Sequence, residues 1–353
     1  MTSELTVPGA PIVLGPNQPE RFYRGGAGIA RFRGTPQSSE YIPEDWVASA
    51  TEIFGQPGDG LTRLGSGQTL RDAIAADPAG FLGPDHVVQY GASPALLVKL
   101  LDTGERLVVH FHPSRDFAAR HLGSRYGKTE AWIILETRQE GGDASAGHVY
   151  LGFKRDADPA VIRRWVADQD TSAILDSLNQ VAVAPGDTCL VPAGVPHAIG
   201  AGITLVELQE PTDFSILLEW AGFPIDGAKE GHLDLGFDVA LTALDYSGWD
   251  ERRLHTLRAP RPGAAERPGV TRLLPAQADT FFRAERVDAS APVTFDPGYS
   301  VLVVTSGHGQ VAYPTGSLAV QRGATVLVPY AAGPATLEGD LQALRCRPPS
   351  PGQ

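Results

Sequence analysis

Histidines at two separate points of the chain have the spacing of metal ligands. His110 and His112 lie two residues apart in the apolar run of residues 107–112, and His197 ends the Pro-Ala-Gly-Val-Pro-His segment of residues 192–197. A β-strand sends residues i and i+2 to the same face, so both imidazoles of the first run leave one side of it. A lone histidine in such a run is usually a hydrogen-bonded core residue. Three of the chain's nine histidines in two motifs instead predict one divalent metal site.

A carboxylate is expected to complete this site. Glu130, which begins the apolar run of residues 130–135, is the best candidate for the fourth ligand. Lys99 interrupts another apolar run, residues 94–101. Burying an ammonium without a partner is costly, so Lys99 either extends to solvent or faces a polar cavity that holds an anion or a carboxylate. We expect the cavity, because the following strand carries two of the histidines.

Residues 113–129 reverse the sign of the chain's charge beside the predicted metal site. Their charged side chains are Arg115, Asp116, Arg120, Arg125 and Lys128. The net charge of the whole chain is −12, so this local excess of cations is unusual. Two interpretations remain open: a solvated helix with internal ion pairs, or a positive field that attracts an anionic and perhaps phosphorylated substrate.

Length and composition limit the classes of protein to consider. A chain of 353 residues exceeds what one core normally supports, so two domains are expected. The negative net charge argues against nucleic acid or an anionic membrane as partner. The two cysteines, Cys189 and Cys346, form no disulfide framework. Without a recognisable signal peptide or an apolar stretch of about 18 residues, the expected location is the cytoplasm.

Short apolar segments separated by Gly and Pro predict a mainly β protein. Expected strands include residues 28–32, 45–49, 147–153 and 203–209. Helices are expected at residues 68–76, 158–166 and 172–178. Thr69 and Asp158 are good N-caps, and Pro159 suits a first helical position. The last two helices form a small insertion at about residues 155–180, of the kind that often covers a site.

A Pro- and Gly-rich stretch at residues 254–269 is interpreted as a linker between two domains. Residues 1–253 then form the metal-binding domain and residues 270–353 the second one. Residues 323–329 repeat the spacing of residues 186–192, but Pro334 stands where the first copy has His197. The second domain is therefore expected to bind no metal and to serve as a packing partner or a homodimer surface.

Five segments together resemble the type I mannose-6-phosphate isomerases, in the shorter form found in bacteria. They are residues 96–99, 110–113, 127–132, 192–200 and 207–213. The Gly-Lys-Thr-Glu of residues 127–130 is the most specific, because ordinary cupins place their Glu only a few residues after the second His. The resemblance spans most of the chain. It implies two cupin (jelly-roll) barrels with helical additions, a metal that is usually zinc, and interconversion of an aldose phosphate and a ketose phosphate.

Carried over residue by residue, the resemblance assigns zinc ligation to His112, Glu130 and His197. It assigns active-site positions to Lys99, Lys128, Glu207 and Asp213. His110 stands where the family usually has Gln, so the ligand set becomes three imidazoles and a carboxylate. This set suits Zn²⁺ and also Mn²⁺, Fe²⁺, Co²⁺ or Ni²⁺. Leu217 replaces an arginine that the family uses in catalysis, which leaves the substrate open.

These features predict a metal-dependent aldose–ketose isomerase acting on mannose 6-phosphate and fructose 6-phosphate or a related sugar. Glu207 or Lys128 would be the base, and Lys99 would stabilise developing negative charge. Asp213 would orient a sugar hydroxyl or a lysine. The alternatives are an isomerase of an unphosphorylated or different sugar, a metal-dependent cupin oxidase or decarboxylase, and a non-catalytic sugar-binding protein with a structural metal.

Overall fold

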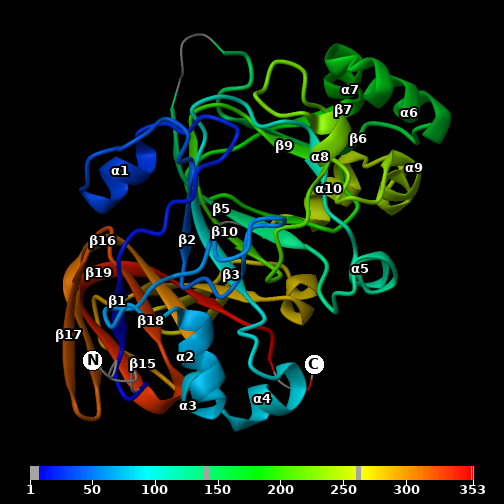
Figure 1. Ribbon diagram of the computed structural model, residues 1–353. Coiled ribbons are helices and arrows are strands. Elements are labelled where there is room, and N and C mark those ends of the chain that lie inside the picture. Colours follow the sequence, from blue (N-terminus) through cyan, green and yellow to red (C-terminus); the bar gives the residue numbers. More distant parts are fainter. Residues whose placement is uncertain (1–7, 139–142, 260–263, 351, 353) are drawn as a thin grey trace.

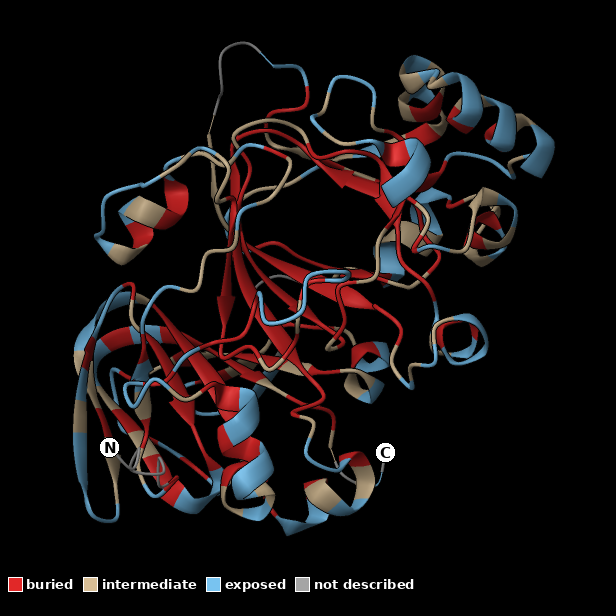
Figure 2. Ribbon diagram, in the orientation of Figure 1, coloured by how far each residue is buried: buried red, intermediate tan, exposed pale blue. Residues whose placement is uncertain are grey.

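The protein is mainly β, as the sequence predicts, with 33% of its residues in strands and 22% in helices. The computed structural model describes residues 8–138, 143–259, 264–350 and 352. Strands form the buried interior, and the helices lie around them with their outer faces exposed (Figure 2). Among the described residues, no helix is long and apolar enough to span a membrane.

Nineteen strands have been assigned within the described residues. Those of the first part of the chain are β1 (Ile12–Leu14), β2 (Glu44–Val47), β3 (Leu97–Asp102), β4 (His110–Phe111), β5 (Glu130–Thr137), β6 (His148–Phe153), β7 (Leu178–Ala182), β8 (Thr188–Val191), β9 (His197–Ile199), β10 (Ile203–Gln209) and β11 (Ile216–Leu217). Those of the later part are β12 (Ala264–Arg267), β13 (Val270–Arg272), β14 (Arg283–Asp288), β15 (Val293–Phe295), β16 (Ser300–Tyr313), β17 (Gly316–Gln321), β18 (Thr325–Val328) and β19 (Ala335–Arg347).

The helices are short, and most of them lie around the outside of the sheets (Figure 1). The α-helices are α1 (Gly28–Arg33), α2 (Leu70–Ala76), α3 (Pro78–Leu82), α4 (Pro84–Tyr90), α5 (Arg115–His121), α6 (Pro159–Asp168), α7 (Thr171–Ser177), α8 (Gly227–Glu230), α9 (Phe237–Ala240) and α10 (Glu251–Thr256). Three 3₁₀ turns are η1 (Leu241–Ala243), η2 (Ala276–Thr280) and η3 (Tyr330–Ala332).

Two five-stranded sheets contain His110, Glu130 and His197 of the predicted metal site, and His112 directly follows β4. One has the order β2-β3-β10-β5-β8 and the other β11-β4-β9-β6-β7. In the first sheet, Lys99 of β3 pairs directly with Glu207 of β10, and Gln209 of β10 pairs with Glu130 of β5. Residues two apart on a strand share a face, so Lys99, Glu207 and Glu130 lie on the same side of this sheet.

The predicted helices form largely where their caps indicated. The Thr69 side chain accepts a hydrogen bond from Asp72 N at the start of α2, and Asp158 accepts one from Ala160 N at the start of α6. Helices α6 and α7 fall within the expected insertion and lie together at one side of the molecule (Figure 1). Their buried side chains pack in one hydrophobic cluster with Phe111 and Phe153 of the histidine-bearing sheet.

The strand expected at residues 28–32 is wrong, because these residues form helix α1. Ile29 and Phe32 are buried at helical spacing, while the Gly28 amide donates to Asp102 Oδ2 at 2.6 Å. A Cβ at Gly28 would lie 2.2 Å from Thr204 Oγ1, so glycine permits the close approach. Tertiary contacts thus decide the conformation of a segment whose local pattern is ambiguous.

The nine-stranded sheet contains the later strands and also β1 from the start of the chain, with Ile12 opposite Leu327. One hydrophobic cluster extends from Leu14 to Cys346 and joins this sheet to the first five-stranded sheet. Within residues 254–269, α10 ends at Thr256 and β12 begins at Ala264, whereas residues 260–263 lie outside the described residues. The division into two domains and the two-barrel arrangement stay predictions.

Candidate active site and metal centre

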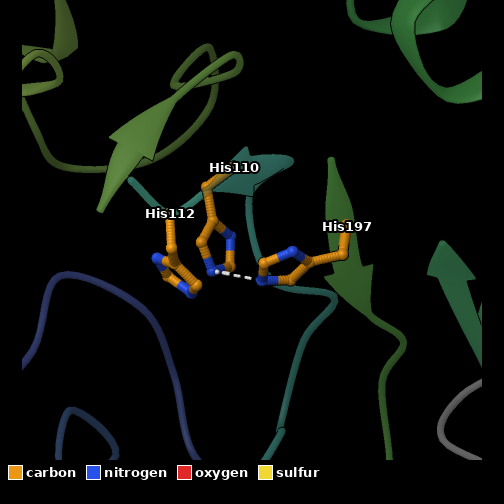
Figure 3. Close-up of side chains that lie close together, drawn as sticks. All are labelled: His110, His112 and His197. Carbon is orange, nitrogen blue, oxygen red and sulfur yellow. Dashed lines mark hydrogen bonds between the residues drawn. The ribbon is translucent and has the colours of Figure 1, made fainter. Parts of the chain in front are cut away.

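The three predicted histidines lie together in the structure. His110 of β4 and His197 of β9 are directly paired across neighbouring strands, and His112 follows two residues after His110. One ring nitrogen from each lies within 4.8 Å of the others, and all three side chains are buried. Figure 3 shows the three rings close together, with His110 and His112 from one segment of the chain and His197 from another. The group could therefore hold a metal ion.

Each imidazole is oriented by a hydrogen bond from its Nδ1 atom to a backbone carbonyl. The distances are 2.9 Å from His110 to Val108 O, 2.7 Å from His112 to Phe214 O and 2.9 Å from His197 to Val195 O. A carbonyl only accepts, so each Nδ1 carries a hydrogen. In a neutral imidazole, Nε2 then carries no hydrogen and has a free lone pair, which is the state that ligates a metal.

The imidazoles are held neutral by their surroundings. Burial lowers the pKa of all three, and for His112 burial and the charge of Lys128 lower the pKa to about 3. For Glu130, burial favours the protonated form, but His112 and Lys128 outweigh it and hold the pKa well below its usual value. Near neutral pH the group therefore consists of three neutral rings and one carboxylate.

Four candidate ligand side chains face one another, and no hydrogen lies between their facing nitrogen and oxygen atoms. The Nε2 atoms of His110 and His197 are 3.1 Å apart (Figure 3), and His112 Nε2 is 2.9 Å from Glu130 Oε2. His197 Nε2 is 3.4 Å from Glu130 Oε1. Ligand atoms about 2.0–2.1 Å from a tetrahedral zinc would lie about 3.3 Å apart. The lone pairs thus fit a divalent cation between them.

A second cluster of charges surrounds Lys99. Its ammonium lies 3.3 Å from Glu44, 3.7 Å from Glu207 and 4.0 Å from Asp213, and its side chain is only 2% exposed. Burial opposes the charged form, but these three carboxylates outweigh it and raise the pKa of Lys99. The polar cavity expected around Lys99 is therefore present, and it is formed by carboxylates.

Glu207 lies between this cluster and the metal ligands. Burial and the negative charge of Glu130 raise the pKa of Glu207 to about 7, although Lys99 and Lys128 act in the opposite direction. Its Oε1 atom is buried and has no hydrogen-bond partner among the described residues. A carboxyl with this pKa can take up or release a proton near neutral pH.

The two clusters line one pocket, with about 510 Å³ of space not filled by atoms, its open mouth included. His110, Glu130, Lys99, Lys128, Glu207 and Asp213 are among the lining residues. Lys128 Nζ lies 3.5 Å from Glu130 Oε2. His112 and His197 are not among the lining residues, but their Nε2 atoms lie 2.9 Å and 3.4 Å from the carboxylate of Glu130, which is a lining residue. All the predicted site residues thus converge on this pocket or adjoin it.

The sequence reasoning missed several pocket residues, among them Arg21, Tyr23 and Glu44. Glu44 accepts hydrogen bonds from the Tyr23 hydroxyl and, at 2.5 Å, from Trp46 Nε1. Arg21 Nη1 is 3.4 Å from Asp213 Oδ2. One signal in the sequence could have indicated Glu44. It stands two residues before Trp46 in a short strand, and alternation places both side chains on one face. No spacing, however, linked these residues to the histidines.

The basic segment of residues 113–129 is largely engaged in structural contacts. It contains α5, and Arg115 bonds to Glu210 at 2.5 Å and to Thr280 O at 3.1 Å. Arg120 bonds to Asp116 O within the helix at 3.0 Å. Of the cations in this segment, Lys128 is the one among the described pocket-lining residues. Of the two interpretations of this segment, a helix whose charges are paired locally fits these contacts better than a positive field that attracts an anionic substrate.

Leu217, where the family resemblance leads us to expect an arginine, lies beside the candidate metal site. It is on β11, directly opposite His110, and lines the pocket. The leucine at position 217, which departs from the pattern of the resembling family, therefore lies in the pocket and not at a remote position.

No protein-family model matches the chain. The similar proteins of known sequence, however, carry names that agree with one another. A probable mannose-6-phosphate isomerase of Bacillus subtilis is 26% identical over 344 residues, which cover 96% of this chain and 99% of the relative. A mannose-6-phosphate isomerase of Streptococcus mutans is 32% identical over 140 residues, which cover 38% of this chain and 41% of the relative.

Solved structures show the same fold. The mannose 6-phosphate isomerase of Bacillus subtilis has a TM-score of 0.74 at 20% identity, covering 96% of this chain and 99% of that one. A mannose 6-phosphate isomerase bound with zinc and yttrium has a TM-score of 0.71 at 13% identity, covering 97% and 100%. With the motifs and the clustered histidines, these relatives lead to one conclusion: in sequence and in fold, the chain is similar to mannose-6-phosphate isomerases.

Proposed function

We propose that this protein is a metal-dependent aldose–ketose isomerase that interconverts mannose 6-phosphate and fructose 6-phosphate. One observation carries the proposal: three imidazole nitrogens and the Glu130 carboxylate converge in a pocket beside Glu207 and Lys99. The names of the relatives support the choice of substrate.

The residues that would hold the metal are His110, His112, Glu130 and His197. Three nitrogens and one carboxylate oxygen suit zinc, and they also accept manganese, iron, cobalt or nickel. A divalent cation bound there would supply a Lewis acid that polarises a sugar carbonyl and its neighbouring hydroxyl. Zinc is our first choice because a zinc-bound relative shares the fold.

Glu207 is the residue we assign as base. Isomerisation removes a proton from C2 of the aldose and returns a proton to C1, so one group must both accept and release it. A carboxyl with a pKa of about 7 is matched to that task near neutral pH. Its Oε1 atom lies 3.7 Å from the Lys99 ammonium but makes no hydrogen bond in the described structure, which leaves a site for the proton. Lys128, the other candidate base, lies against Glu130 at 3.5 Å and would instead stabilise charge near the metal ligands.

Lys99 and Asp213 would act on the sugar's oxygens. The raised pKa of Lys99 keeps it an ammonium, which can donate hydrogen bonds to an oxygen that gains negative charge when C2 loses its proton. Asp213 is 4.0 Å from Lys99 and 3.4 Å from Arg21, so it would orient both cations or accept from a sugar hydroxyl. A homodimer and a cytoplasmic location also remain predictions.

The proposal is tested by following proton exchange without oxygen. The metal-loaded protein should convert mannose 6-phosphate in deuterated water, incorporate solvent deuterium and lose activity with a chelator. His197→Ala and Glu130→Ala should lose both bound metal and conversion. His148→Ala is a suitable control, because His148 lies on β6 outside the pocket and bonds to Ala146 O at 3.0 Å.

Substrate range and reaction class are checked in the same assay. Free mannose and related ketoses, compared with mannose 6-phosphate, will show whether Leu217 alters the choice of sugar. Oxygen consumption with no deuterium exchange would assign an oxidase instead. Metal binding without exchange on any of these sugars would overturn the isomerase assignment.

A further inference from the structure

The spacing Glu-x-Trp occurs twice in the sheet that carries Lys99 and Glu130, as Glu44 to Trp46 on β2 and as Glu130 to Trp132 on β5. Residues two apart on a strand share a face, so each tryptophan lies beside its glutamate on the side of the sheet that faces the metal pocket. Both tryptophans are fully buried. Neither has a role in the reaction proposed above.

Each indole N–H donates to the carboxylate two residues before it. Trp132 Nε1 lies 3.0 Å from Glu130 Oε1, and Trp46 Nε1 lies 2.5 Å from Glu44 Oε2. An indole nitrogen can only donate, and a buried one needs an acceptor. The hydrogen bond therefore satisfies the indole and also fixes which way each carboxylate is turned.

Strand register places the two tryptophans on either side of the Lys99–Glu207 pair. Trp46 lies opposite Lys99. Glu207 pairs with Lys99 on one neighbouring strand and with Trp132 on the other. Lys99 Nζ is 4.4 Å from the centre of the Trp46 ring, whereas the Trp132 ring lies 5.6 Å from that of His197. One Glu-x-Trp unit thus adjoins the lysine cluster, and the other adjoins the candidate metal ligands.

The two carboxylate oxygens of Glu130 have different surroundings. Oε1 accepts the Trp132 hydrogen bond and lies 3.4 Å from His197 Nε2. Oε2 is buried and makes no hydrogen bond in the described structure, although His112 Nε2 is 2.9 Å away and Lys128 Nζ 3.5 Å away. His112 Nε2 is likewise buried with no hydrogen-bond partner among the described residues. The indole thus occupies one oxygen and leaves the other, beside an imidazole lone pair, for a cation.

We propose that Trp132 is a positioning residue of the metal centre, whose N–H holds Glu130 so that Oε2 is the oxygen presented to the metal. The inference rests on the metal site of the proposed function. Hydrogen bonds to ligating side chains strengthen metal binding about tenfold to a hundredfold, because they hold the ligand in its bound orientation. A tryptophan that only filled the core would affect stability but not the metal affinity of the folded protein.

Zinc affinity of the folded protein tests this role separately from catalysis. Competition with a chromophoric chelator near neutral pH measures it. Trp132→Phe keeps a buried aromatic ring but removes the donor, so it should bind Zn²⁺ about tenfold to a hundredfold more weakly than the wild type. Trp46→Phe is the matched control, because it removes the same kind of hydrogen bond from the other Glu-x-Trp unit. Its affinity for Zn²⁺ should equal that of the wild type.

An isosteric replacement protects the test against changes in packing. Benzothienylalanine has the shape of tryptophan with sulfur in place of the N–H, so its incorporation at position 132 removes only the donor. This protein should bind Zn²⁺ as weakly as Trp132→Phe does. Urea unfolding of each metal-free protein, followed by circular dichroism, checks that the variants compared are folded.

The possible results separate this inference from the proposed function. Equal zinc affinities in the wild type and Trp132→Phe would overturn the role of Trp132 and leave the metal site intact. Equal weakening in Trp132→Phe and Trp46→Phe, or normal affinity with the isostere, would assign the effect to packing and also overturn it. A wild-type protein that binds neither zinc, manganese nor cobalt would overturn the metal site itself.

Discussion

Individual residues of the metal pocket are held in states that cost stability and enable chemistry. Glu207 is the clearest case, since burial and the neighbouring Glu130 charge resist its ionisation. Its folded-state pKa of about 7 lies above the ordinary value of 4.5. The folded state therefore holds this proton more tightly than the unfolded state does. The stabilisation from Glu207 is complete below pH 4.5 and is lost as the pH rises through about 7.

Replacing Glu207 by Gln should therefore raise stability at high pH and remove activity. In the metal-free protein at pH 8, Glu207→Gln should be more stable than the wild type by up to about 3 kcal/mol, because no buried carboxylate has to ionise. The difference should shrink toward pH 5. Urea unfolding at the two pH values measures it, and deuterium exchange should show a fall in kcat. A variant less stable than the wild type at pH 8 would contradict this account of Glu207.

Strand pairing positions the candidate metal ligands, and helix caps fix where the surrounding helices begin. Strand β4 is only two residues long, yet its pairing with β9 brings His110 and His197 together. Helix α2 begins at an N-cap, Thr69, and buries Leu70, Ala73 and Ile74 in the large hydrophobic cluster. The cap is local, whereas the burial depends on the rest of the molecule.

Thr69→Ala should test the contribution of this cap alone. It removes the hydrogen bond from Asp72 N at 3.1 Å and the one to Asp72 Oδ2 at 2.6 Å. We expect a loss of about 1 kcal/mol in the free energy of unfolding, measured with urea, and unchanged isomerase kinetics. Thr69→Ser keeps the hydroxyl and should recover most of the loss. Equal losses in both variants would assign the effect to the methyl group and its packing.

At the scale of the whole molecule, early and late segments of the described chain are built into one structure. Strand β1 pairs with β18, and the Arg33 side chain bonds both Asp45 and, at 3.2 Å, Thr325 Oγ1. Gly323 approaches α1 so closely that a Cβ would lie 2.2 Å from Phe32 O. This contact fixes the nine-stranded sheet against the metal-binding part.

Gly323 and Gly186 form a matched pair for testing that contact, because they occupy equivalent positions in the two motif copies. Their φ values are +88° and +86°, but a Cβ at Gly186 would meet nothing within 4 Å. Gly186→Ala should cost only the backbone strain, about 1 kcal/mol, whereas Gly323→Ala should cost several kcal/mol. Urea midpoints compare the two variants. Equal losses of stability in the two variants would mean that the contact between Gly323 and α1 adjusts to a Cβ at little cost.

Much of the site could be predicted from local pattern. The i, i+2 spacing of His110 and His112, the caps Thr69 and Asp158, and the motif that ends at His197 depend on regularities within a few residues. Glu130 and Lys99 stood out because a charge in an apolar run needs a partner. The local pattern failed at α1, where helix and strand propensities differ little and contact with Asp102 and Thr204 decides the outcome.

The sequence by itself determined that the imidazoles would meet at one candidate metal site, because strand periodicity and motif spacing act over short distances. Only the tertiary structure decided which further groups join them. The pairing of β2 with β3 places Trp46 opposite Lys99 and brings Glu44 to the pocket. The same pocket is lined by Arg21 and Tyr23, which precede β2 in the chain. Such pairing depends on the summed burial of many side chains far apart in the chain, and no local spacing encodes it.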